Sequence, residues 1–254
     1  MTDVQPEAVA WWREFFESAD SIPLSFFPAE DETERQVAGL TRLLGLRAGE
    51  RLADICCGMG RHAVPLSRAG LNVCGLDASA MMLRIARALG RGTRSLRLVQ
   101  GDAARLPFRS EAFDALVNLF NSFGYFEDDG ENVAVLAEAA RCLRPGGRFL
   151  LETRNRAYQI LYAPYHQEDT LADGSPAIIR CRYDEATHQL SSTWADPEDL
   201  DRILYRARIR LYGLEELVGL CADAGLAVGG VYSEYDGRPF EGWERMMIVH
   251  ARKQ

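Results

Sequence analysis

Lysine is almost absent from this chain of 254 residues: Lys253 is the only one, so 28 of the 29 basic residues are arginines. A Schiff-base, phosphate-loop or protein-kinase lysine would have to be this penultimate residue, which makes those chemistries poor predictions. Long apolar runs are absent too, because charged residues or glycines interrupt each run well before the roughly 20 residues that a membrane helix needs. The first residues lack the basic and then apolar segments of a secretion signal. We therefore expect a soluble, cytoplasmic protein with no membrane partner.

Positive charge is also in short supply. The formal net charge is −8 and the pI is about 5.2, so the protein as a whole repels phosphate backbones and nucleic acid is not an expected partner. The six cysteines include no C-x-x-C pair, and the adjacent thiols of Cys56 and Cys57 lack the partner spacing of a metal centre. We predict no metal site. The hydrophobic fraction of 47% is nonetheless typical of a folded protein with a full core.

The apolar pattern between residues 51 and 152 indicates an α/β protein. Short apolar runs alternate there with helical stretches, one of which begins after Ser79 and another of which stops at Arg144-Pro-Gly-Gly. The five predicted strands are residues 51–56, 72–77, 96–100, 112–119 and 147–152. This alternation predicts a doubly wound, mostly parallel sheet with helices on both faces.

The segments on either side of this core have a different pattern. Trp11, Trp12, Phe15 and Phe16 have helical spacing, which predicts an N-terminal helical lid over residues 1–45. After residue 152 the alternation stops, and residues 177–183, 189–194 and 203–212 are typical of strands joined by short turns. We therefore expect a single domain of 254 residues with a seven-stranded mixed sheet. Its parts are a helical lid (1–45), a core expected to bind a cofactor (46–154), an inserted antiparallel region expected to contact the substrate (155–212) and a completion of the core sheet (213–254).

Three carboxylates and a glycine turn fall at the ends of successive predicted strands. The first strand runs from Asp54 into the turn Gly58-Met-Gly60, where a ligand can approach backbone N–H groups at a helix start. Asp77 lies 19 residues after Gly58 and can accept both hydroxyls of a ribose. Asp102 ends the third strand and can accept a hydrogen bond from an adenine amino group. The glycine turn and Asp77 alone would fit any nucleoside-binding doubly wound fold.

The charge of Asp54 separates the candidate ligands. A dinucleotide places its diphosphate over the glycine turn, where an anionic Asp54 is unfavourable, whereas a ligand with an ammonium group would be attracted to it. The third glycine of the dinucleotide pattern is also missing, because position 63 is Ala63. Together the carboxylates suit an amine, a ribose and an adenine.

These residues resemble the class I S-adenosylmethionine-dependent methyltransferases. The matching motifs are Asp54-Ile-Cys-Cys-Gly58-Met-Gly60, Gly75-Leu-Asp77, Gly101-Asp102-Ala103, Phe113-Asp114-Ala-Leu-Val-Asn118 and Leu143-Arg-Pro-Gly-Gly-Arg-Phe. The chain departs from the family at Cys56, where the pattern usually has its first glycine. A small unbranched side chain is expected to fit there, with a displaced turn as the alternative.

The resemblance implies a Rossmann-like methyltransferase fold, S-adenosylmethionine as cofactor and a set of binding residues. Asp54, the Gly58–Gly60 turn and the backbone near Asn118 would hold the methionine part, Asp77 the ribose, and Asp102 with Ala103 the adenine. The full predicted cofactor set is Asp54, Cys56, Gly58, Gly60, Arg61, Asp77, Ala78, Asp102, Ala103 and Asn118. Residues 118–126 are similar to the corresponding stretch of small-molecule N-methyltransferases, including the sugar-amine and glycine types.

We therefore predict methyl transfer to a small-molecule acceptor, with an amine as one candidate and the attacking atom (N, O or C) left open. A neutral amine needs no base, whereas an oxygen or carbon nucleophile does, and then Tyr125 and His62 are the first candidates. A histidine at this place is more often a locally packed helix-start residue than a base, so His62 stays a candidate only. Tyr125 and Arg154 lie just past strand ends, where doubly wound folds place their sites.

Three alternatives stay open. A macromolecule methyltransferase would want a basic face, and only Arg206, Arg208 and Arg210, which share one face of a predicted strand, offer one. A nucleotide-binding protein without methyltransferase activity would have to tolerate Asp54 under its ligand, and a non-enzymatic module would bind the cofactor without turnover. A homodimer is compatible with the sequence, which does not identify the acceptor.

Overall fold

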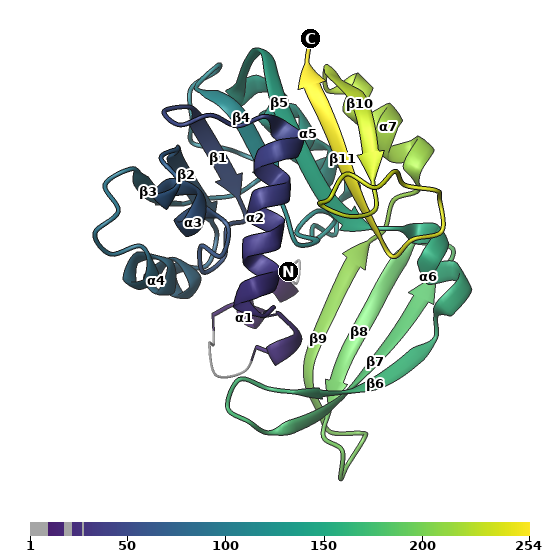
Figure 1. Cartoon of the computed structure of the whole chain (residues 1–254). Coiled ribbons are helices and arrows are strands. Elements are labelled where there is room, and N and C mark those ends of the chain that lie inside the picture. Colours follow the sequence, from purple (N-terminus) through teal and green to yellow (C-terminus); the bar gives the residue numbers. More distant parts are fainter. Residues whose placement is uncertain (1–9, 18–21, 27) are drawn as a thin grey trace, which may run out of the picture.

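The computed structural model describes residues 10–17, 22–26 and 28–254, and two sheets dominate it (Figure 1). The larger sheet has seven strands in the order β10-β11-β5-β4-β1-β2-β3. Its members are β1 (Arg51–Ile55), β2 (Asn72–Asp77), β3 (Leu96–Gln100), β4 (Phe113–Asn118), β5 (Leu143–Arg154), β10 (Leu226–Tyr232) and β11 (Met246–Lys253). The first five strands pair in parallel, and β11 pairs antiparallel with both β5 and β10. The predicted mostly parallel α/β sheet is confirmed.

Helices cover both faces of this sheet because its buried residues alternate between two apolar clusters. On β4, Leu116 belongs to the cluster under α5 (Asp129–Cys142) and α7 (Leu214–Asp223). Its neighbours Ala115 and Val117 belong to the cluster under α2 (Glu30–Leu44), α3 (Ala63–Arg68) and α4 (Ala80–Leu89). No helix in the described part of the chain is long and apolar enough to span a membrane.

The helix ends follow the local sequence. The Ser79 hydroxyl accepts a hydrogen bond from the Met82 N–H at 3.1 Å, which caps α4 as predicted. Gly45 ends α2 in the left-handed conformation with φ 57°. The predicted boundary at Arg144-Pro-Gly-Gly differs from the structure: α5 ends at Cys142 and β5 already begins at Leu143. The pairing of β4 with β5 absorbs this turn as a register shift between Phe113 and Ala115.

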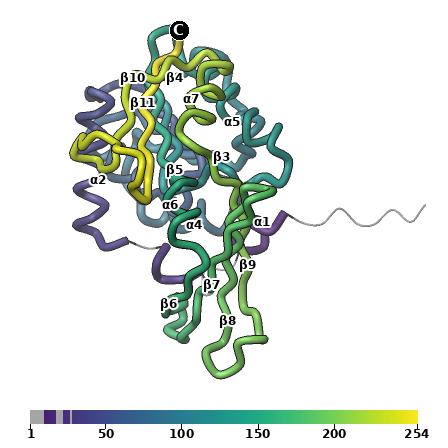
Figure 2. The backbone as a smooth tube through the Cα atoms, turned by 90° about the vertical axis from the view of Figure 1, so that its right-hand side faces the viewer, coloured from purple at the N-terminus to yellow at the C-terminus, as the bar shows by residue number. Residues whose placement is uncertain are grey.

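The second sheet, called here the cover sheet, has the order β6-β7-β8-β9 and is antiparallel throughout. Its strands are β6 (Tyr165–Thr170), β7 (Pro176–Asp184), β8 (Gln189–Ala195) and β9 (Ile203–Arg210), and they extend from one end of the core (Figures 1 and 2). The prediction missed β6, because this edge strand has the polar sequence Tyr-His-Gln-Glu-Asp-Thr and no apolar alternation. The inserted segment leaves and re-enters the core at neighbouring points, since Asn155 and Tyr212 form a parallel bridge.

The N-terminal segment packs between the two sheets. Helix α1 (Trp11–Phe15) lies beside β9 (Figure 2), and the Phe15 ring is 5.5 Å from that of Trp194 on β8. A 3-10 turn, η2 (Leu24–Phe26), follows. Residues 1–9, 18–21 and Phe27 of the predicted lid lie outside the described residues. The division of the chain into parts stays a prediction.

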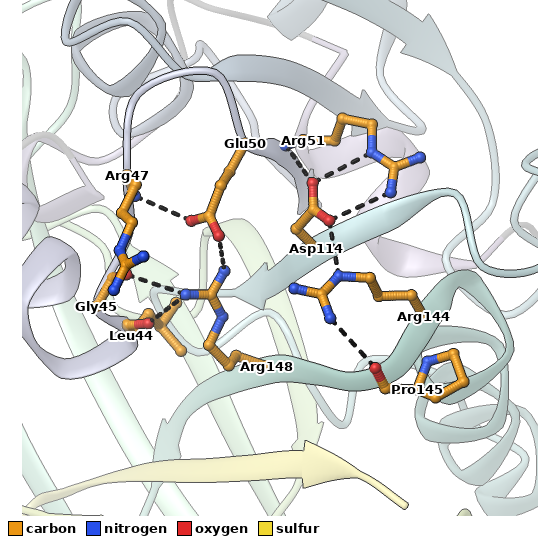
Figure 3. Close-up of polar contacts among 9 residues, drawn as sticks. All are labelled: Leu44, Gly45, Arg47, Glu50, Arg51, Asp114, Arg144, Pro145 and Arg148. Carbon is orange, nitrogen blue, oxygen red and sulfur yellow. Dashed lines mark hydrogen bonds and ion pairs between the residues drawn. The ribbon is translucent and has the colours of Figure 1, made fainter.

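A paired network of charges closes the amino-terminal end of the parallel strands (Figure 3). The buried Arg148 on β5 donates from Nη1 to the carbonyl oxygens of Leu44 and Gly45, at 2.9 and 3.0 Å, and from Nη2 to Glu50 at 2.7 Å. This side chain ties the last turn of α2 to the sheet. Beside it, Asp114 accepts from both Arg51 and Arg144, at 3.1 and 2.8 Å.

Candidate functional site

A cavity opens at the carboxyl ends of the parallel strands, on the side of the core that faces the cover sheet. It encloses about 1100 Å³ of atom-free space, part of which is open to solvent. Aromatic and aliphatic side chains form most of its wall, and three aspartates interrupt that wall: Asp54, Asp77 and Asp102. Trp12, Phe16, Ile22 and Phe26 of the N-terminal segment also line it. The core sheet thus contributes the polar groups, and the N-terminal segment contributes an apolar cover.

The glycine turn connects β1 to α3 under this cavity. The Gly58 N–H donates to Asp77 Oδ2 at 2.7 Å, and a Cβ built on Gly58 would meet no atom within 4 Å. Gly58 is therefore open to the cavity that it lines. Gly60, with φ 80°, packs instead against Val64 and Ala86. Gly60 is not among the cavity-lining residues, so the structure gives it a packing role.

Cys56 takes the backbone conformation that a glycine would take. Its φ is 59°, in the left-handed region, which costs an L-residue roughly 1–2 kcal/mol. The turn nevertheless keeps its place, because the Cys57 N–H donates to the Leu76 carbonyl at 2.9 Å and Gly58 still reaches Asp77. A small side chain at Cys56 thus fits this turn, as expected.

Asp54 and Arg61 present two unlike charges to the same cavity. Asp54 is 2% exposed, and its Oδ2 has no hydrogen-bond partner. Burial, helped by the negative charge of Asp77, raises the pKa of Asp54 to about 7. Arg61 donates from Nη1 to the Thr33 hydroxyl at 3.2 Å and lies over the Phe120 ring at 4.8 Å, while its buried Nη2 has no partner. Buried polar groups are almost always satisfied, so these two atoms point to a zwitterionic ligand.

The other two aspartates are held by backbone N–H groups. Asp77 accepts from Gly58 through Oδ2 and from Ser79 through Oδ1, at 2.7 and 2.9 Å, and each oxygen keeps a lone pair for a ligand hydroxyl. Asp102 accepts from the Ala104 N–H at 2.8 Å through Oδ1. Ala78 and Ala103 line the cavity beside them. The predicted ribose and adenine residues thus lie along one wall.

Asn118 and Arg154 lie at strand ends near the cavity without lining it. The Asn118 amide donates to the Ile55 carbonyl at 3.2 Å, so this side chain joins β4 to β1 from within the core. The next two residues, Leu119 and Phe120, do line the cavity. Arg154 ends β5, and its buried Nη1 has no partner.

The two candidate bases also line the cavity. His62 Nε2 is 3.0 Å from the Gln36 side-chain oxygen, and burial together with the Arg61 charge holds the pKa of His62 well below its usual value. The Tyr125 ring stacks on Phe16 and lies 4.9 Å from the Trp11 ring. Burial raises the pKa of this phenol, and the Arg154 charge opposes the rise only partly. Both side chains are uncharged near neutral pH, and a role as base stays a prediction.

Several residues that hold this site were not predicted. Thr33 and Gln36 on α2 contact Arg61 and His62, and Glu152 on β5 accepts a hydrogen bond from the Phe120 N–H. The sequence signal that could have indicated Gln36 and Glu152 is a polar residue within an apolar stretch. Gln36 precedes Val37 in the apolar part of its helix, and Glu152 follows the run Phe149-Leu-Leu.

The arginines of β9 do not form an open basic face. Arg208 lies 3.7 Å from Glu127, and Arg210 is paired with Glu216. Arg206 is exposed. Acidic residues therefore offset two of the three charges that a macromolecular substrate would need.

Comparisons with known proteins agree with this geometry. A family model described as a methyltransferase domain matches residues 52–147. The demethylmenaquinone methyltransferase of Corynebacterium kroppenstedtii is 32% identical over 177 residues, which cover 68% of this chain and 73% of the relative. That of Mycobacterium sp. (strain KMS) is 37% identical over 126 residues, which cover 48% of this chain. The match spans only 51% of the latter relative, about half its length.

Solved structures share the fold. The CcbJ methyltransferase from Streptomyces caelestis superimposes with a TM-score of 0.78 at 22% identity, covering 94% of this chain and 98% of that one. The SAM-bound CalS10, an amino pentose methyltransferase from Micromonospora echinaspora, gives a TM-score of 0.66 at 22% identity, covering 90% and 93%. With the family match and the relative from Corynebacterium kroppenstedtii, the chain belongs to the S-adenosylmethionine-dependent methyltransferases.

Proposed function

We propose that this protein transfers a methyl group from S-adenosylmethionine to a small-molecule acceptor, and that the attacking atom is an amine nitrogen. The observation that carries the proposal is that Asp54 and Arg61, residues of opposite charge, line one cavity and each keep a buried side-chain atom without a partner. When bound, S-adenosylmethionine supplies a methyl group activated by a sulfonium.

The polar groups of the cavity suit the parts of this cofactor. Asp54 is suited to the ammonium group and Arg61 to the carboxylate of the amino-acid part. Asp77 is suited to the ribose hydroxyls, and Asp102 to the adenine amino group. This assignment would give every unpartnered charge of the cavity wall a partner of opposite sign.

The two candidate bases support an amine acceptor. His62 is held by Gln36 with a lowered pKa, and the pKa of Tyr125 is raised, so neither group is suited to remove a proton near pH 7. A neutral amine attacks with its own lone pair. The protein then has to align the acceptor and exclude water, for which the cover of Trp12, Phe16 and Phe26 is placed. Aromatic faces also favour the positive charge that develops on nitrogen.

A second acceptor class is a quinone-type ring, which the names of the curated relatives favour. A ring carbon of the reduced, hydroquinone form is then the nucleophile, and a base is required to remove its phenolic proton. This alternative makes Tyr125 or His62 essential, whereas the amine proposal does not.

The test is a labelled transfer reaction. The purified protein is incubated with methyl-labelled S-adenosylmethionine and a metabolite extract, a panel of primary amines, or chemically reduced demethylmenaquinone, and products are identified by mass spectrometry. We expect labelled N-methyl products. Label on a quinone ring would replace the amine by the second class, and cofactor binding without any transfer would contradict the enzymatic proposal.

A further inference from the structure

Two opposite charges face the same cavity without meeting. Asp54 Oδ2 and Arg61 Nη2 are both buried and unpartnered, and among the described residues no carboxylate oxygen lies within 4.0 Å of the Arg61 guanidinium. Unlike charges attract strongly where water is excluded. The contacts that hold Arg61 in place therefore bear on whether both groups stay available to a ligand.

Glu152 is placed to do this through the residue beneath Arg61. This carboxylate, 6% exposed, accepts the Phe120 N–H and the Tyr235 hydroxyl, each at 2.7 Å from Oε2. The Arg61 guanidinium rests on the Phe120 ring at 4.8 Å. Fixing the backbone of Phe120 thus fixes the surface on which Arg61 lies.

Glu152 also acts on Arg61 by its charge. Burial lowers the pKa of Arg61, and Glu152 has the largest opposing electrostatic effect, ahead of Asp54. The Thr33 hydroxyl adds a hydrogen bond at 3.2 Å on the α2 side.

We propose that Glu152 and Tyr235 are positioning residues that hold Arg61 apart from Asp54, so that both charges stay free for the amino-acid part of the cofactor. This inference rests on the proposed function, because it takes S-adenosylmethionine as the ligand. Tyr235 belongs to the segment between β10 and β11, 83 residues from Glu152 in sequence. The site would thus depend on a C-terminal residue outside the matched domain of residues 52–147.

Two ligands separate this role from a general structural one. S-adenosylhomocysteine has the ammonium and carboxylate groups, whereas 5′-methylthioadenosine has the nucleoside alone. By titration calorimetry on the full chain, we expect Glu152→Gln to weaken binding of S-adenosylhomocysteine about tenfold and Tyr235→Phe somewhat less. Binding of 5′-methylthioadenosine should stay within about twofold of wild type. Tyr232→Phe, on the neighbouring strand, is the matched control and should change neither.

A double-mutant cycle sharpens the test. In an Arg61→Met background, Glu152→Gln should have little further effect on S-adenosylhomocysteine, because the group that it positions is gone. Equal weakening of both ligands, or full additivity with Arg61→Met, would overturn the inference. A wild-type protein that binds neither ligand would instead overturn the proposed function, and this inference with it.

Discussion

The two ends of the central sheet treat buried and half-buried charged residues in opposite ways. At the amino end of the parallel strands, Arg148 and Asp114 have their partners within the chain (Figure 3). At the carboxyl end, Asp54 and Arg61 each keep a buried atom without a partner. Removing one partner of a buried charge pair is strongly destabilising, whereas a buried charge that lacks a partner within the chain lowers stability until a ligand pairs with it. The first end therefore serves the fold, and the second serves binding.

The direction of the pKa shifts reflects this difference. Burial alone would raise the pKa of Asp114, but hydrogen bonds from Arg51 and Arg144 hold it well below its usual range. Burial and Asp77 raise the pKa of Asp54 to about 7. Asp114 at the amino end is thus ionised near neutral pH, whereas Asp54 at the carboxyl end has a pKa close to neutral pH.

The largest expected effect is on stability at the amino end. Arg148→Met removes the donor to Leu44, Gly45 and Glu50, so the free energy of unfolding should fall by about 3 kcal/mol, as measured by urea denaturation. The affinity of the folded protein for S-adenosylhomocysteine should not change. The exposed Arg97 on β3 is the control, since Arg97→Met should alter neither quantity. Weaker ligand binding in Arg148→Met would break the comparison.

The next largest effect is on binding at the carboxyl end. Asp54→Asn keeps the shape of the side chain and removes its charge, so the affinity for S-adenosylhomocysteine should fall by roughly 10- to 100-fold. The melting temperature of the free protein should rise at pH 8, because an uncompensated buried carboxylate is removed. Calorimetry and thermal unfolding measure the two effects. A lower melting temperature together with unchanged affinity would assign Asp54 to the fold.

The protonation of Asp54 predicts how stability and ligand affinity depend on pH. In the free folded protein Asp54 keeps its proton up to about pH 7, whereas the unfolded chain releases it near the usual 3.8. The contribution of Asp54 to stability therefore falls as the pH rises between these values and is constant above them. Only the ionised form of Asp54 attracts an ammonium group, and this form becomes rarer as the pH is lowered below 7. The affinity for S-adenosylhomocysteine should therefore fall by up to about tenfold for each pH unit below pH 7.

The control for that titration is Asp54→Asn, in which the dependence below pH 7 should largely disappear. Titration calorimetry in buffers of different ionisation enthalpy would also detect the proton that Asp54 releases on binding. A wild-type affinity that is constant from about pH 5.5 to 8 would contradict the raised pKa.

The smallest expected effect is at Tyr125. If the acceptor is an amine, Tyr125→Phe keeps the ring against Trp11 and Phe16 and should change kcat by less than about threefold. Single-turnover rates with a labelled methyl group measure this. A loss of 100-fold or more would make the hydroxyl a base and favour a carbon or oxygen acceptor.

The sequence was sufficient for the parts of the site that follow from periodicity. Asp54, Asp77 and Asp102 end successive parallel strands, and such ends meet at one edge of a sheet, so their common cavity could be predicted. Gly60 and Asn118 belong to the same motifs, but they do not line the cavity. Gly60 packs within the turn, and Asn118 bonds to a neighbouring strand within the core. Motif membership does not distinguish a residue that contacts a ligand from one that supports it.

The remaining features depend on contacts between distant segments. Glu152 meets Tyr235 across 83 residues, and Arg61 meets Thr33 across 28. No local pattern records such a pair. Strand β6 was missed for a different reason, since it lies at the edge of the cover sheet and is largely exposed. An edge strand of this kind needs no apolar alternation.

The bridge between Asn155 and Tyr212 has a consequence for how such an enzyme can change. The chain between these two residues, 156–211, leaves the core sheet and returns to it at neighbouring points. An inserted segment whose two ends are adjacent can be exchanged, lengthened or shortened with little disturbance to the domain that carries it. Residues 156–211 contribute none of the residues that line the cavity. Exchanging residues 156–211 between related chains should therefore leave the cofactor-lining residues in place.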